Sequence, residues 1–172
     1  LEAQSSKPVA AEPPSCELDG TVMLVIDGDP AARSRLSDQL NAWGAKAYGV
    51  ETAQKAVAVL SAVAARGAKA LPIIIADADM PDMDGIDFVR RLRAEAALAP
   101  TAVMMICAED DHARIRALRS LRVISILQRA EPAQGSLRGD VKEDALIRAL
   151  RKSVGMQTQQ ITPLDPSGAT TL

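Results

Sequence analysis

The chain has 172 residues, of which 48% are hydrophobic and 24% are charged, and its formal net charge is -2. This length can bury one full hydrophobic core, and the near-neutral charge argues against a chain-wide surface for nucleic acid or anionic membranes. Aromatic residues make up only 2% of the chain, so the core must be aliphatic and stacking platforms for bases are not expected.

Cellular location is predicted from apolar runs and cysteines. No uninterrupted apolar stretch approaches the roughly 20 residues that span a bilayer, and the start lacks the apolar core of a signal peptide. Cys16 lies in a polar segment and Cys107 in an apolar one, which does not indicate a disulfide framework. We therefore expect a cytoplasmic chain with no membrane segment.

Both ends of the chain differ in composition from its centre. Residues 1–19 and 156–172 mix small, polar and proline residues without a hydrophobic period, which is typical of linkers. We predict a flexible linker or an expression-derived arm at 1–19, a single folded domain at 20–155 and a flexible tail at 156–172.

Short apolar runs then alternate with longer helical segments, as in βα units on a parallel sheet. The run TVMLVID at 21–27 predicts a strand buried on both faces. A helix follows, with Asp29 as its N-cap and Pro30 at its first position. A less apolar strand at 45–51 is expected nearer an edge, and an alanine-rich helix at 52–67 comes after it.

The second half of the chain continues this alternation. Strands and helices are expected in turn at residues 71–77, 86–98, 101–107, 111–121, 122–128 and 141–155. Asp140 and Glu143 have the spacing of a capping box before the last helix. Short right-handed connections favour an α/β flavodoxin-like (βα)5 fold, a doubly wound parallel sheet with strand order 2-1-3-4-5, whose ligand site lies beyond the carboxyl ends of the strands.

Acidic residues follow two of the buried strands. Strand one ends in VIDGD and strand three in IIIAD, so Asp27 and Asp77 should emerge side by side at one edge of the sheet. Carboxylates that share a pocket raise each other's pKa unless a hard cation compensates, and Mg²⁺ prefers oxygen ligands. The sequence therefore predicts a magnesium pocket, in which a carboxylate can attack phosphorus and form an aspartyl-phosphate.

The segments VMLVIDGDP and IIIADADMPDMDG resemble the receiver domain of two-component response regulators, and the resemblance covers about residues 17–155. It implies that Asp77 is the phosphoacceptor and that Asp27, Asp77 and the main-chain carbonyl of Asp79 hold Mg²⁺. It also implies a signalling module rather than an enzyme. The expected partners are a histidine kinase or histidine phosphotransfer domain and the neighbouring domains of a hybrid kinase or multidomain regulator.

Several positions depart from the family pattern. Gly28 replaces the second acidic ligand, which should weaken Mg²⁺ binding, and Asp29 is either a substitute ligand or only a helix N-cap. Cys107 occupies the switch Thr/Ser position, where a thiol is a weak donor, although a small buried side chain is a simpler interpretation than a redox-sensitive one. Ile126 occupies an aromatic position, and Arg129 partly matches the family lysine.

A second hypothesis is a pseudo-receiver that takes no phosphate. Such a module would dock a protein or bind an anionic ligand, for example a cyclic dinucleotide, through arginines and the long insertion at 131–140 with its Arg138. The arginines concerned are Arg114, Arg116, Arg119 and Arg122. The alternative for them is a solvated helix face.

Three further expectations concern the same loops. Asp82 and Asp84 are expected to be solvated turn residues and not metal ligands. His112, the single histidine, is expected to be exposed and not a phosphorelay site. A flavin-binding flavodoxin relative is disfavoured, because the first loop has no Ser/Thr/Gly-rich phosphate cradle and aromatic residues are too few to sandwich a ring.

Overall fold

A computed structural model describes residues 18–108, 110–129 and 141–161, with side chains placed up to residue 155. Its five strands form one parallel sheet in the order β2-β1-β3-β4-β5, so the predicted fold class and strand order are confirmed. The strands are β1 (Val22–Ile26), β2 (Lys46–Val50), β3 (Ile73–Asp77), β4 (Val103–Cys107) and β5 (Ser125–Gln128).

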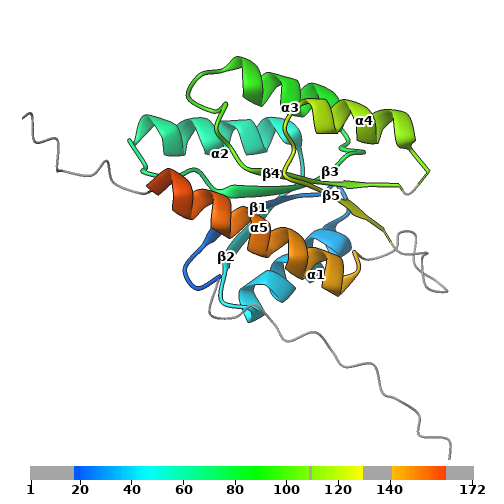
Figure 1. The fold of residues 1–172 in the computed structure, drawn as a ribbon, viewed down its shortest axis with the longest axis horizontal. Helices are drawn as coiled ribbons and strands as arrows, with labels where there is room; N and C mark the ends of the chain where they lie inside the picture. The colour runs from blue at the N-terminus through cyan, green and yellow to red at the C-terminus, as the bar shows by residue number, and fades with distance from the viewer. Residues whose placement is uncertain (1–17, 109, 130–140, 162–172) are drawn as a thin grey trace, which may run out of the picture.

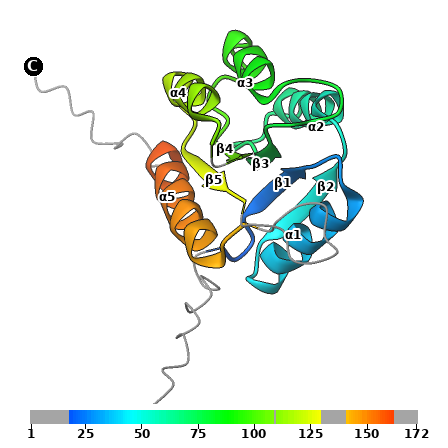
Figure 2. The same cartoon turned by 90° about the vertical axis from the view of Figure 1, so that its right-hand side faces the viewer.

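Helices cover both faces of the sheet. They are α1 (Pro30–Ala42), α2 (Ala53–Ala65), α3 (Gly85–Ala94), α4 (His112–Ser120) and α5 (Glu143–Ile161). Helices α2, α3 and α4 lie on one face, and α1 and α5 lie on the other (Figure 1). The view turned by 90° shows the same three layers, with β1 and β2 beside α1 (Figure 2). This doubly wound arrangement leaves the carboxyl ends of all five strands at one edge.

Side-chain alternation along the central strands supplies both cores. In β3, Ile74 and Ala76 belong to the core under α2, α3 and α4, while Ile73 and Ile75 belong to the core over α1 and α5. All residues of β3 and β4 are buried, whereas β2 is exposed or partly exposed, as expected of the predicted edge strand. The buried central strands fix the position of the residues that follow them.

The largest differences from the predicted boundaries lie in three elements. Helix α3 ends at Ala94 rather than at residue 98, because Glu95 takes an extended conformation. Strand β5 begins at Ser125 rather than at residue 122, because Arg122 has a positive φ of 59° that does not suit a strand. Helix α5 begins at Glu143 and continues to Ile161, beyond the predicted end at residue 155.

The predicted terminal segments lie largely outside the described residues. Leu18 is fully buried and packs with the core over α1 and α5, so the described fold includes residues before the predicted start at residue 20. Asp140 of the predicted capping box and the insertion at 131–140 also lie outside the described residues. Within the described ranges, no helix is long and apolar enough to cross a membrane.

Candidate acidic site

Asp27 and Asp77 meet at the carboxyl edge of the sheet. Strand β1 pairs with β3 up to Ile26 and Ala76, so the next residue of each strand is one of these aspartates. Both are buried, with 3% and 2% of their surface exposed. A buried carboxylate is costly unless it is paired and hydrogen-bonded, so the partners of these two groups decide what the site can do.

Arg129 bridges the two aspartates. Its Nη2 lies 2.7 Å from Oδ2 of Asp77 and 3.1 Å from Oδ2 of Asp27, and only 16% of the arginine side chain is exposed. Burial alone would lower the pKa of Arg129, but the charges and hydrogen bonds of the two aspartates outweigh burial and raise that pKa. The guanidinium is therefore a permanent internal cation between the carboxylates.

The remaining oxygens of both aspartates accept hydrogen bonds from the following main chain. Asp27 Oδ1 accepts from the N–H of Asp29 at 2.9 Å, and Asp77 Oδ1 accepts from the N–H of Asp79 at 3.0 Å. Arg33, which the sequence analysis did not identify, donates to the carbonyl oxygen of Asp27 at 2.7 Å. These contacts hold the carboxylates in orientations that suit Arg129.

Asp29 caps a helix instead of joining the acidic pair. Its Oδ1 accepts from the N–H of Ala31 at 3.0 Å, which makes it the N-cap of α1 before Pro30. Of the two predicted alternatives for Asp29, the structure shows the N-cap.

The two carboxylates of the predicted magnesium site share a cation that belongs to the protein itself. Gly28 supplies no ligand, and a Cβ added to it would lie 3.0 Å from the Pro81 ring. Arg129 already places one positive charge between the two carboxylates. Among the residues that the structure describes, no group of three or more His, Cys, Asp or Glu side chains is arranged to hold a metal ion.

Arg114 connects the loop after β3 to helix α4. Its guanidinium pairs with Asp79 at 2.8 Å, Asp84 at 3.0 Å and Asp111 at 3.3 Å. Burial alone would lower the pKa of Arg114, but the hydrogen bond and charge of Asp79, with the other two carboxylates, raise it. The crowding of aspartates in this loop is therefore relieved by a second internal cation.

Asp82 is exposed in a bend and Asp84 is partly exposed, as the sequence analysis expected, but both also accept main-chain hydrogen bonds. The two oxygens of Asp82 accept from the main-chain N–H groups of Ala53 and Gln54, each at 2.9 Å, at the start of α2. Asp84 is the N-cap of α3 through its bond to the N–H of Ile86 at 2.8 Å. The sequence analysis missed these bonds, because the loop folds against two helix amino termini, whose free N–H groups attract carboxylates.

The loop carrying these acids is held close to the sheet at Gly85. A Cβ on Gly85 would lie 2.5 Å from Cε of Met105 and 2.9 Å from Cα of Ala78. Only glycine permits this approach, since real Cβ atoms do not come so near to backbone atoms. Asp84 and Gly85 thus form the start of α3, which packs on Ala78 after β3 and on Met105 of β4.

The residues at the switch positions are apolar in character. Cys107 ends β4 with 1% of its surface exposed, and burial, with nearby carboxylates, raises the pKa of its thiol to about 11. Ile126 on β5 is partly buried and packs against the core under α2, α3 and α4. Neither side chain offers a hydroxyl to a phosphoryl group.

The arginines of the predicted basic surface differ in their exposure to solvent. Arg114 is used internally, whereas Arg116, Arg119 and Arg122 are exposed, as is His112. Arg138 lies outside the described residues. A residue that sequence reasoning missed is Arg93, which donates to four main-chain carbonyls near the opposite edge of the sheet. No local motif indicates that role, because its acceptors come from two other loops.

Comparison with known proteins supports this description. The sequence model of the response regulator receiver domain family matches residues 23–134, which is more than half of the chain. The sensor histidine kinase RcsC of Salmonella typhimurium is 33% identical over 92 residues, covering 54% of this chain but 9% of that protein. RcsC of Escherichia coli is 31% identical over 97 residues, covering 54% and 10%. The chain thus spans about a tenth of these curated relatives.

Solved structures show the same fold at lower identity. A response regulator receiver protein from Pseudomonas putida has a TM-score of 0.62 at 22% identity, over 77% of this chain and 97% of that one. The signal receiver domain of a histidine kinase from Syntrophus aciditrophicus has a TM-score of 0.63 at 18% identity, over 89% and 98%.

Proposed function

The chain belongs to the response regulator receiver domain family of two-component signalling, and we propose that within this family it signals by docking and not by taking phosphate. One observation carries this proposal: Arg129 bridges the buried carboxylates of Asp27 and Asp77. The arginine is covalently part of the domain, so the acidic pair is compensated at all times. A phosphate-dependent receiver needs a site that a metal and a phosphodonor can enter.

The energetic argument concerns what Mg²⁺ must displace. A metal at this edge would compete with a guanidinium that is buried and hydrogen-bonded to both carboxylates, and separating such a pair is unfavourable. Gly28 provides no third carboxylate to offset that cost. We therefore infer weak or absent Mg²⁺ binding, and with it little transfer of phosphate to Asp77, whose side chain is only 3% exposed.

The experiment is incubation with a small-molecule phosphodonor at several millimolar Mg²⁺, followed by intact mass measurement, with calorimetric titration of Mg²⁺ in parallel. We expect no mass gain of a phosphoryl group and no saturable heat. A gain that disappears in Asp77→Asn would refute the proposal. The matched control is Asp38→Asn, since Asp38 is an exposed acid of α1 and makes the same change in charge.

Phosphorylation of Asp77 is the second candidate function. It is favoured by the position of Asp77 at the end of β3 beside Asp27, followed by the intact MPDMDG loop. A carboxylate oxygen of Asp77 would attack the phosphorus of a phosphohistidine as the P–N bond breaks and the nitrogen keeps the electron pair. Arg129 would have to release Asp77 first. The mass experiment decides between the two functions.

We propose that the partner is a histidine kinase, a histidine phosphotransfer domain or a neighbouring domain of a larger cytoplasmic protein. The supporting observation is the similarity to part of RcsC, a sensor histidine kinase. In the docking function, α4 is held to the loop after β3 by Arg114 without any phosphoryl group. A pull-down with the cognate kinase should then give equal binding for the wild type and Asp77→Asn.

A further inference from the structure

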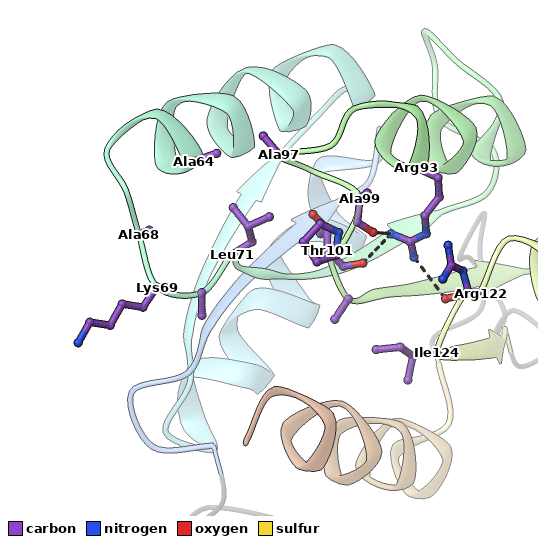
Figure 3. A pocket seen from close by; sticks show the side chains of 13 residues that line it. Ala64, Ala68, Lys69, Leu71, Arg93, Ala97, Ala99, Thr101, Arg122 and Ile124 are labelled. Carbon is purple, nitrogen blue, oxygen red and sulfur yellow. Dashed lines mark hydrogen bonds between the residues drawn. The ribbon is translucent and has the colours of Figure 1, made fainter. Parts of the chain in front are cut away.

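A cavity lies at the edge of the sheet opposite the acidic pair. Its volume is about 430 Å³, within the range of small-molecule sites. Leu71, Thr101 and Ile124, which precede β3, β4 and β5, line it together with the ends of α2 and α3 (Figure 3). It shares no lining residue with the acidic site.

The charged side chains of this cavity are all cationic. Arg93, Arg122 and Lys69 line it, and no described Asp or Glu does. None of these three residues forms an ion pair with a described residue. Figure 3 shows Arg93 and Arg122 together at one end, whereas the amine of Lys69 extends away from the opposite end. The cavity therefore has one concentrated positive end.

Arg93 is held rigidly at that end. It donates to the carbonyl oxygens of Leu121, Ala99, Thr101 and Arg122 at distances between 2.8 and 3.2 Å. These four bonds use four of its five N–H groups, and carbonyl dipoles leave its net charge unchanged. Burial, and then the charge of Arg122, lower the pKa of Arg93. The two guanidinium groups thus repel each other, and a bound anion would relieve the repulsion.

Arg122 has an unusual backbone. Its φ of 59° is the only positive φ among described non-glycine residues, and such a conformation is uncommon for a long side chain. This conformation accompanies the bond from Arg93 Nη2 to the Arg122 carbonyl, while the Arg122 side chain remains exposed. Gly or Asn would fit this backbone with less strain, so the choice of arginine points to its charge.

We propose that this cavity binds a small organic anion, with a carboxylate or phosphate group at Arg93 and Arg122 and a short aliphatic body. The planar fork of Arg122 suits both anionic groups, while Arg93 contributes its charge and its one remaining N–H group. The wall beyond them is small and aliphatic, with Ala64, Leu71 and Ile124 among its residues. Among the described residues, no aromatic side chain lines the cavity, so the site does not favour a nucleobase.

The test is ¹⁵N-¹H NMR titration of the whole chain with succinate, and separately with glycerol 3-phosphate, at constant ionic strength. We expect saturable shifts at residues 99, 101, 102 and 121–124, and the arm with the lower Kd identifies the preferred anionic group. Arg122→Asn keeps a residue that tolerates the positive φ, and should weaken binding by about tenfold through loss of one charged hydrogen-bonding group. Arg122→Lys should restore part of the affinity.

The matched control is Arg116→Gln, which removes one exposed arginine of α4 that does not line the cavity. It should change Kd by less than about twofold, because exposed charges act weakly through solvent. Absence of saturable shifts for both anions would overturn the proposal. An equal loss of affinity in Arg116→Gln, or an unchanged Kd in a folded Arg122→Asn, would also overturn it. None of these outcomes depends on phosphorylation of Asp77.

Discussion

Replacing Arg129 by alanine tests the assignment of this residue as the internal cation of the acidic site. The change leaves Asp27 and Asp77 buried beside each other without the guanidinium that bridges them. Removal of one partner from a buried ion pair costs about 3 kcal/mol or more. In a domain of this size, that loss lowers Tm by about 6–12 °C. Thermal and urea denaturation at pH 7 measure it.

The same variant should gain a response to Mg²⁺ that the wild type lacks. With the guanidinium gone, a divalent cation is the nearest substitute for its charge. If Mg²⁺ binds the variant with a Kd of about 1 mM, a concentration of about 10 mM restores about 1.4 kcal/mol of stability. Thermal melts of both proteins with and without Mg²⁺ compare this directly.

Two results would refute the reasoning about Arg129. One is a loss of stability no greater than that of Arg116→Ala, which removes an exposed arginine from α4. The other is an equal stabilisation of wild type and variant by Mg²⁺. Either result would mean that Arg129 does not compensate the acidic pair.

The remaining predictions concern the loops and the thiol. Arg114→Ala should lower the free energy of unfolding by about 1–2 kcal/mol, because it breaks three partly exposed ion pairs. It should also speed amide exchange at the start of α4, and added salt should reduce the difference in stability from the wild type. Asp82→Ala should lower the free energy of unfolding by about 1 kcal/mol at pH 7, because two main-chain N–H groups at the start of α2 lose their acceptor while Thr52 remains the N-cap. Main-chain hydrogen bonds lower the pKa of Asp82 below its ordinary 3.8 despite the opposing effect of burial, so this difference should be complete above pH 3.8 and shrink as pH falls through the lowered value; Asp82→Asn should recover part of it. In a Cys16→Ser background, Cys107 should react with iodoacetamide about 100-fold more slowly than a free cysteine near pH 8, because burial raises the pKa of its thiol from 9.0 to about 11. Rapid labelling in the folded protein would contradict that burial.

Much of this protein was predictable from local patterns. Continuous apolar runs predict buried parallel strands, and capping residues such as Asp29 and Thr52 predict where helices begin. The right-handed connection rule then leaves few strand orders, so the meeting of Asp27 and Asp77 at one edge follows from the sequence. Helix ends were less predictable, as α3 and α5 show, because several residues beyond a helix retain helical propensity.

What the sequence by itself determined is the sheet and the pair of aspartates at its edge, since period and strand ends are properties of neighbouring residues. Only the tertiary structure decided which hydrogen-bond donor each acidic side chain meets. Arg129 lies 52 residues from Asp77, Arg114 lies 35 from Asp79, and Asp82 lies 29 from Ala53. Such pairs depend on how loops and helices pack around the sheet, and a long side chain can reach several acceptors, so no local spacing selects among them.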